Sequence, residues 1–291
     1  MPVSYLALGE RDFVTLDEAG ISHSARKCLH SRGNRQVSMK ENEMVFGIRA
    51  VIEAIQADKE VDKILVRRDL QGELAKELFG VLRGRDIPVQ RVPAERLDRL
   101  TRKNHQGVIA FISAVTYQHL EDIVPFIYEQ GKDPFIVLLD GVTDVRNFGA
   151  IARTCECAGV DAIVIPARGS VSVNADAIKT SAGALHVLPV CKERSINEAI
   201  RFLQQSGVKV YAATEKARAN YTTVAYEGPV ALVMGAEDTG VSPENLRICD
   251  EMIRIPQFGT IGSLNVSVAA SILMYEVVRQ RMGRDEEGKG E

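Results

Sequence analysis

Five polar side chains stand in three short segments, each of which follows a strongly apolar run. Amide, carboxylate and hydroxyl groups can hold or orient a substrate hydroxyl, and an arginine can bind a phosphate through two parallel hydrogen bonds. The segments are DGVTDVRNFGAIART (140–154), GAEDTGVSPE (235–244) and PQFGTIGSLNVS (256–267). Their candidate side chains are Asn147 and Arg153, then Glu237, and finally Ser263 and Asn265.

Each of these residues also has an ordinary structural interpretation. Asn147 and Gly149 could form a turn, and the third segment could supply a helix cap and a turn. Arg153 could lie along a helix with its head in water, and Glu237 could be a loop acid. Taken singly, the structural interpretation is favoured for each residue. A shared site becomes the better hypothesis only if the fold brings the three segments together.

The elements before these segments predict that convergence. FIVLLD (135–140) is a continuous apolar run typical of a parallel strand buried on both faces, and PVALVMG (229–235) and EMIRIP (251–256) are further predicted strands. They alternate with helices predicted over 147–158, 174–185, 195–206 and 264–282. This alternation predicts an α/β domain over 135–284, a parallel sheet with helices on both faces. Ligands of such sheets bind beyond the carboxyl ends of the strands, where all three segments would meet.

The remainder of the chain divides into four parts. Residues 43–115 alternate three helices with three strands and predict a small α/β domain, followed by a linker over 116–134. Residues 1–42 lack sustained periodicity and predict a disordered arm, and residues 285–291 predict a disordered tail. No apolar run is long enough to span a bilayer and no signal-peptide pattern opens the chain, so we expect a cytoplasmic protein without a membrane partner.

Charge and cysteine usage narrow the function further. The formal net charge of −3 does not suggest an overall nucleic-acid binder, but residues 43–115 hold 13 Lys/Arg against 11 Asp/Glu. Five cysteines are scattered, and Cys155 and Cys157 would point to different sides of one helix, so no metal site is predicted. A basic cluster in the small domain is either an RNA contact or a solvated helix face. Its members are Arg96, Arg99, Arg102 and Lys103.

Common nucleotide and hydrolase motifs are absent from the sequence. GAEDTG follows a strand but is not G-x-G-x-x-G, and no G-K-[ST] follows it. With only five histidines, of which His105 and His186 are isolated, no Ser/His/Asp set is credible. The dehydrogenase, kinase and triad-hydrolase interpretations therefore fail.

The three segments resemble the three motifs of the SpoU (TrmH-like) RNA ribose 2′-O-methyltransferases, within the SPOUT superfamily. NFGAIARTCECAG, VMGAEDTGVSPE and IPQFGTIGSLNVSVAA match in order and spacing across roughly 135–282. VFGIRAVIEAI through NHQGVIAFIS resembles the L30e-like RNA-binding domain of the RlmB branch, which methylates a guanosine of bacterial 23S rRNA.

The resemblance implies properties that the pattern alone does not. It implies a C-terminal trefoil knot, an exception to the rule that chains do not thread loops. It implies S-adenosylmethionine as methyl donor, held largely by backbone groups at Gly235, Ile255 and Leu264, with no metal. It also implies a homodimer that pairs through the catalytic domain. Helix 264–282 is apolar on several faces, which is consistent with burial on more than one side.

The resemblance assigns Asn147, Arg153, Glu237, Ser263 and Asn265 to the catalytic site. A guanidinium stays protonated far above neutral pH, so we expect Arg153 to bind an RNA phosphate rather than to act as a base. Glu237 would orient Arg153 or a neighbouring amide. Ser263 and Asn265, two residues apart, would face the ligands. Ser267 is predicted to bond within the first helical turn.

Two rival functions remain open at this point. A tRNA ribose 2′-O-methyltransferase is the alternative within the same enzyme class, although such enzymes tend to lack an L30e-like module. A non-catalytic rRNA-binding assembly factor is the alternative from another class. The intact polar residues of the three motifs argue against a factor without activity. The sequence does not identify the target nucleotide.

Overall fold

The computed structural model describes residues 44–85 and 87–287, and the side chains within these ranges as far as residue 283. The predicted arm over 1–42 lies outside the described residues. Chain contacts separate Met1–Lys40 from Glu41–Glu291, and every element described below belongs to the second unit.

Residues 44–112 form a small mixed sheet in the strand order β1-β4-β2-β3. Only β2 and β3 pair in parallel, whereas β4 runs antiparallel to both of its neighbours. Helices α2 and α3 pack on one face and α4 lies against the other. The elements are β1 (Met44–Phe46), α2 (Ile48–Gln56), β2 (Val61–Arg67), α3 (Glu73–Leu82), β3 (Val89–Val92), α4 (Ala94–Leu100) and β4 (Val108–Ile112). The predicted small α/β domain is present, with β1 as an additional strand.

Helix α5 (Leu120–Glu129) leads into a seven-stranded sheet in the order β7-β6-β5-β10-β8-β11-β9. Every neighbouring pair in this sheet is parallel, as the sequence predicted. The strands are β5 (Phe135–Asp140), β6 (Ala162–Pro166), β7 (Val190–Glu193), β8 (Lys209–Ala213), β9 (Ala219–Asn220), β10 (Val230–Gly235) and β11 (Glu251–Arg254).

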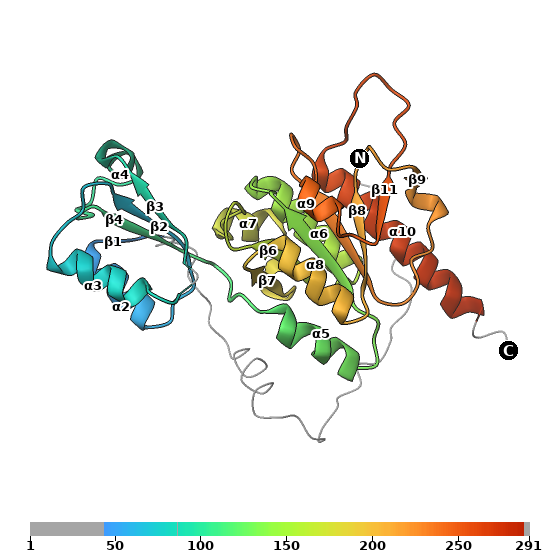
Figure 1. Cartoon of the computed structure of the whole chain (residues 1–291), viewed down its shortest axis with the longest axis horizontal. Coiled ribbons are helices and arrows are strands. Elements are labelled where there is room, and N and C mark those ends of the chain that lie inside the picture. The colour runs from blue at the N-terminus through green and yellow to red at the C-terminus, as the bar shows by residue number, and fades with distance from the viewer. Residues whose placement is uncertain (1–43, 86, 288–291) are drawn as a thin grey trace, which may run out of the picture. The chain divides into compact units, whose positions relative to one another are not determined.

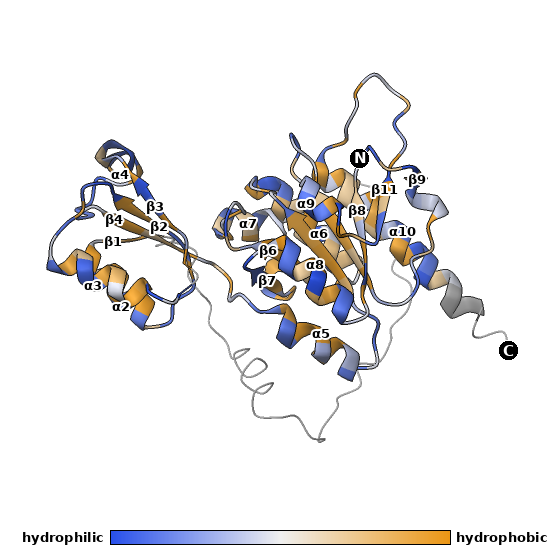
Figure 2. Cartoon of the chain, in the orientation of Figure 1, coloured by the Kyte–Doolittle hydropathy of each residue, from blue (hydrophilic) through white to orange (hydrophobic). Residues whose placement is uncertain are grey.

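Helices cover both faces of this sheet (Figure 1). The side chains of Phe135, Val137 and Leu139 enter a core with α6, α7 and α10, whereas Ile136 and Leu138 enter a second core with α5 and α8. The strand is therefore apolar throughout because both of its faces are covered, and Figure 2 shows the apolar strands between helices that are polar outside. The helices are α6 (Val145–Cys157), α7 (Ala175–Thr180), α8 (Ile196–Gln205), α9 (Pro243–Leu246) and α10 (Val266–Glu287), with short 3-10 turns at Ala184–His186 and Tyr221–Thr223.

The parallel arrangement places the three motif segments at one edge of the sheet. Strands β5 and β10 are neighbours, and Asp140 pairs with Gly235 at their carboxyl ends. The third segment follows β11, which lies beyond β8 in the same sheet. The alternation of strands and helices thus correctly predicted which loops lie at the carboxyl edge.

Helix α10 is longer than the sequence suggested. It begins at Val266 and continues to Glu287, whereas we expected the helix to end at 282 and a disordered tail over 285–291. Charged residues in the final turns do not interrupt a helix whose earlier turns are held by the core, because tertiary packing stabilises helices beyond their local propensity. Residues 288–291 lie outside the described part of the chain.

Candidate active site

The side-chain amide of Asn265 joins all three motif segments. Its Nδ2 donates to Oδ1 of Asn147 at 3.0 Å and also to Oε1 of Glu237. These partners belong to the segments after β5 and β10, while Asn265 itself ends the segment after β11. One amide group therefore fixes the relative positions of three loops that lie far apart in the sequence.

Asn265 is also the cap of helix α10. Its Oδ1 accepts from the backbone N of Ser267 at 3.0 Å and from the Ser267 hydroxyl at 2.6 Å. The predicted structural role of Ser267 in the first turn is confirmed. Because one end of the amide caps the helix, the other end is left pointing at Asn147 and Glu237, so the start of α10 orients the polar network.

Asn147 is presented by the capped start of α6. Asp144 accepts from the backbone N of Arg146 at 2.9 Å and of Asn147 at 2.8 Å, which satisfies two of the free amides of the first turn. The helix begins at Val145, two residues before the predicted 147. The side chain of Asn147 is not used in capping and reaches Asn265.

Gly149, five residues beyond the capping residue Asp144, is not a turn residue. It lies within α6, where a Cβ would come within 2.5 Å of the Cβ of Thr180. Close packing of α6 on α7 therefore explains this glycine, in place of the turn considered from the sequence.

The loop that carries Glu237 is held by a carboxylate that the sequence analysis did not select. Asp140 Oδ2 accepts from the backbone N of Ser242 at 2.8 Å and from Nδ2 of Asn245 at 2.9 Å. Asn245 is buried, with 3% of its surface exposed. Asp140 ends the strand FIVLLD, and an acid at the end of a buried strand was the available signal. Its observed role is to position the Glu237 loop.

Gly235 is required for a reason that differs from the one expected. We expected a side chain there to prevent approach of a ligand. A Cβ would instead lie 2.0 Å from the backbone carbonyl carbon of Gly240 and 2.1 Å from the backbone N of Val241. The loop folds back over Gly235 through a hydrogen bond from Gly240 N to Ala236 O at 2.9 Å. A larger residue would therefore displace the Glu237 loop as well.

Arg153 and Ser263 remain outside the hydrogen-bonded network. Arg153 is exposed on α6 and makes no hydrogen bond or ion pair with any residue that the structure describes. Glu237 therefore contacts the amide of Asn265 and not Arg153, which resolves the two possibilities left open by the sequence. Ser263 is exposed in the loop before α10. An exposed guanidinium without a partner in the described chain is available for an anionic ligand.

The backbone of the third segment suits a polar ligand such as the implied cofactor. Within the described chain, residues 256–264 form no backbone–backbone hydrogen bond, and the carbonyl of Ile255 accepts only from the side chain of Gln257 at 3.2 Å. Leu264 is exposed beside Asn265. Free N–H and C=O groups on the loop that leads to Asn265 fit a ligand that is held mainly by the backbone.

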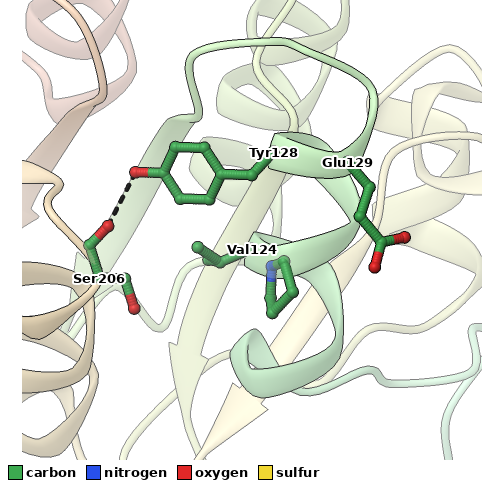
Figure 3. A pocket seen from close by; sticks show the side chains of 5 residues that line it. Val124, Tyr128, Glu129 and Ser206 are labelled. Atoms are coloured by element: carbon green, nitrogen blue, oxygen red, sulfur yellow. Dashed lines mark hydrogen bonds between the residues drawn. The ribbon is translucent and has the colours of Figure 1, made fainter.

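A hollow elsewhere on the domain is distinct from this site. Figure 3 shows it lined by Val124, Pro125, Tyr128, Glu129 and Ser206, with the Tyr128 hydroxyl donating to the carbonyl of Ser206 at 2.8 Å. Helix α5 precedes β5 and Ser206 precedes β8, so this hollow lies at the amino ends of the strands. The motif loops lie at the opposite ends of the strands, the carboxyl ends.

The four cysteines in the described part of the chain are free thiols. Cys155 is buried and Cys157 is exposed, so the two thiols point apart as predicted. Burial raises the pKa of the Cys155 and Cys191 thiols strongly, and that of Cys249 to about 12, which keeps them protonated. Cys28 lies outside the described residues. Among the residues described, no group of three or more His, Cys, Asp and Glu could hold a metal ion.

In the small domain, the four residues of the basic cluster are all exposed. Lys103 lies over the ring of Phe46, 5.0 Å from its centre, whereas the three arginines of the cluster have no ion-pair partner among the described residues. His105, which follows the cluster, pairs with Asp98 at 2.9 Å. This histidine therefore has a structural role.

None of the helices in the described part of the chain is long and apolar enough to cross a bilayer.

Comparison with known proteins agrees with this arrangement. The SpoU rRNA Methylase family matches residues 134–275, and the family described as RNA 2′-O ribose methyltransferase substrate binding matches residues 44–118. The 23S rRNA (guanosine-2′-O-)-methyltransferase RlmB of Photobacterium profundum is 34% identical over 242 residues, covering 82% of this chain and 98% of that protein. YacO of Bacillus subtilis, named for the TrmH family of tRNA/rRNA methyltransferases, is 32% identical and covers 83% of this chain and 97% of its own length.

Solved structures of methyltransferases are also similar to this chain. The AdoMet-bound rRNA methyltransferase from Sinorhizobium meliloti is 26% identical, with a TM-score of 0.52, and covers 81% of this chain and 86% of that one. AviRb from Streptomyces viridochromogenes, a SpoU methyltransferase, shares the fold with a TM-score of 0.53 at 23% identity, over 82% of this chain and 90% of its own. The fold and these relatives show that the protein is an S-adenosylmethionine-dependent RNA ribose 2′-O-methyltransferase. The chain belongs to the SpoU (TrmH-like) family of these enzymes.

Proposed function

We propose that this enzyme methylates the ribose 2′-hydroxyl of a guanosine in bacterial 23S rRNA. The observation that carries the site is the hydrogen bonding of Asn265 to Asn147 and Glu237, which assembles three motif loops. The choice of RNA is supported by the similarity to RlmB of Photobacterium profundum and by the substrate-binding domain over 44–118. A reaction on rRNA would take place in the cytoplasm.

The residues proposed to hold S-adenosylmethionine are Gly235, Ile255 and Leu264. They stand on the loops after β10 and β11, where the backbone of 256–264 has free donors and acceptors. S-adenosylmethionine supplies the methyl group when bound. The protein then has two tasks, which are to hold the ribose hydroxyl in line with that methyl group and to assist the loss of its proton.

Arg153 is proposed to bind the phosphate next to the reacting ribose. Its guanidinium has no partner in the described chain. A bidentate grip on one phosphate would orient the ribose and stabilise negative charge developing on the 2′-oxygen. Asn147, Glu237 and Ser263 would then provide hydrogen-bonding groups around the hydroxyl. Both N–H groups of Asn265 are used by Asn147 and Glu237, and its oxygen accepts from Ser267, so Asn265 would act by holding these side chains in place.

The active form is proposed to be a homodimer that pairs through α10. Val268, Tyr275 and Met282 are 47%, 50% and 61% exposed and recur every seven residues on this helix. Seven residues are close to two helical turns, so these side chains form one apolar stripe on the outer face. A second copy of the helix would cover the stripe. The trefoil knot implied by the family resemblance belongs to the same proposal.

Two further assignments complete the proposal. The exposed arginines Arg96, Arg99 and Arg102, with Lys103, are proposed to contact RNA phosphates. A tRNA substrate is the second candidate, because YacO is named for a family of tRNA/rRNA methyltransferases. A non-catalytic assembly factor is disfavoured, because the polar network is complete.

Mapping of 2′-O-methyl groups tests the substrate. Ribosomal and transfer RNA from a strain lacking the gene would be compared by mass spectrometry with RNA from strains carrying the wild-type gene or Asn265→Ala. We expect one guanosine of 23S rRNA to lose its methyl group in the deletion strain and to regain it only with the wild-type gene. Loss confined to tRNA would replace the proposed substrate, and unchanged methylation of both RNAs would reject the proposed activity.

A further inference from the structure

Phe258 is the most exposed of the large apolar side chains in the described chain, with 98% of its surface accessible. It lies in the loop between β11 and α10, flanked by Gln257 and Gly259. Ile261 in the same loop is 76% exposed. Figure 1 shows this loop as an arch that rises away from the sheet, above the β11 label.

A single exposed apolar residue needs no special explanation, but the position of this one is informative. The loop ends in Ser263, Leu264 and Asn265, and Asn265 is fixed to the motif loops. Phe258 is five residues from Ser263, a distance that an extended chain spans in at most about 18 Å. Aromatic residues are also scarce, at 5% of the chain, and Trp is absent. An aromatic ring displayed this near the reacting site is available to the substrate.

Three components of the working enzyme could cover the ring, namely the cofactor, a partner copy and the RNA. The apolar stripe proposed for pairing lies on α10 itself, whereas Phe258 stands apart among the exposed polar and glycine residues Gln257, Gly259 and Thr260. Phe258 and Ile261 alone, separated by glycine and polar residues, do not make the contiguous apolar centre of a protein interface. The ring of Phe258 does suit a nucleobase, which offers a π-face for stacking and polar edges for an amide and a hydroxyl.

We propose that Phe258 stacks on a base of the substrate RNA next to the methylated nucleotide. The proposal rests on the proposed function, because it takes RNA as the ligand of this edge. Stacking tolerates any base, so Phe258 would contribute affinity and would help to hold the ribose at the site without selecting the sequence. The loop backbone and its glycines would let the ring adjust to the RNA before Asn147 and Arg153 act on the ribose and phosphate.

The absence of tryptophan makes a direct test possible. Phe258→Trp would carry the only tryptophan of the chain, and Val187→Trp would place one at another exposed apolar position, 60% accessible, as a control. Each variant would be titrated with unmethylated 23S rRNA and tRNA from the deletion strain, and separately with S-adenosylhomocysteine. We expect RNA to quench the fluorescence of the Phe258→Trp variant, S-adenosylhomocysteine to leave it unchanged, and the control to respond to neither.

Kinetics of aromatic and aliphatic variants complete the test. Phe258→Ala and Phe258→Leu should raise the KM for RNA about tenfold, while Phe258→Tyr stays near wild type, since stacking needs the ring rather than apolar volume. Cofactor affinity by calorimetry and mass by light scattering should not change. Quenching by S-adenosylhomocysteine alone, or a lowered mass for Phe258→Ala, would assign the ring to the cofactor or the partner copy and overturn the proposal. If the wild-type enzyme methylates neither RNA, the proposed function is rejected, whatever the fluorescence of the Phe258→Trp variant shows.

Discussion

Asn265 at the start of α10 donates a 3.0 Å hydrogen bond to Asn147 in the first turn of α6, across a sequence separation of 118 residues. The same amide nitrogen donates to Glu237, while its oxygen caps α10. The polar site and the helix start are therefore parts of one structure. Each part can be perturbed separately by substitution.

Glu237→Gln should reduce turnover more than it reduces cofactor affinity. The variant keeps the side-chain size but replaces the negatively charged acceptor of Asn265 with a neutral one. A hydrogen bond to a charged group contributes about 1.5–3 kcal/mol, so kcat should fall roughly ten- to a hundredfold. Single-turnover assays and calorimetric titration of S-adenosylmethionine measure the two effects. Equal losses in both would show that Glu237 acts through the cofactor.

Arg153→Ala should abolish methyl transfer and leave S-adenosylmethionine affinity close to wild type, because the guanidinium is proposed to bind RNA. Arg153→Lys should fail nearly as badly, since a point charge does not reproduce a planar fork on a phosphate. RNA binding of both variants should depend less steeply on salt than that of wild type. Restoration of most activity by lysine would contradict a bidentate contact.

Gly235→Ala should destabilise the catalytic domain and weaken the site together. The added Cβ would meet the backbone at Gly240 and Val241, so the Glu237 loop must move. Gly80→Ala is the matched control, because Gly80 lies within α3 and a Cβ there meets nothing within 4 Å. Thermal unfolding should show a lowered Tm for Gly235→Ala and, since Ala favours helix over Gly by about 1 kcal/mol, a slightly raised one for Gly80→Ala. If Gly235→Ala is as stable as wild type, the backbone of Gly240 and Val241 does not pass as close to Gly235 as described.

Glu276 should make a pH-dependent contribution to stability. Hydrogen bonds from Arg279 hold the pKa of this carboxyl below its ordinary 4.5, and Gln280 adds another at 2.8 Å. A lowered pKa in the folded state means that the stabilisation is present above pH 4.5 and is lost as the pH falls through the folded value. Urea unfolding of wild type and Glu276→Gln should therefore differ most at pH 7, and the difference should narrow as the pH is lowered from 4.5 towards 3. A constant difference across that range would exclude this linkage.

Tyr275→Asp should convert the proposed dimer into a monomer. The substitution places a charge in the middle of the exposed stripe on α10, where a partner helix would bury it without a counter-charge. Val187→Asp, at an exposed apolar site outside the stripe, should keep the wild-type mass. Light scattering at micromolar concentration compares the two. A wild-type protein that is already monomeric would end the homodimer proposal.

The sequence predicted the sheet and its loops well because buried parallel strands have a strong local signature. FIVLLD is apolar at every position, and β5 spans those six residues. Short elements gave no such signal, so the three-residue β1 and the two-residue β9 were missed. Their pairing depends on neighbours elsewhere in the chain.

The sequence indicated candidate residues for the site, but it did not indicate which residues they contact. The sequence indicated Asn147, Glu237 and Asn265, whereas the bond between Glu237 and Asn265 depends on how two loops meet. The same limitation concealed the role of Asp140, whose contacts are with Ser242 and Asn245 about a hundred residues later in the chain (separations of 102 and 105). Gly235 was selected correctly as a constrained position, but only the path of the Gly240 backbone explains the constraint.

The dual role of Asn265 also bears on when the enzyme becomes active during its synthesis. The loops after β5 and β10 leave the ribosome well before residue 265, and they lack their common amide until the start of α10 follows them. The Asn147 contact spans 118 residues, so it closes only after the intervening chain has folded. A nascent chain still short of α10 would thus have its sheet but no assembled site. Methylation would in this way require a chain that extends through the start of α10.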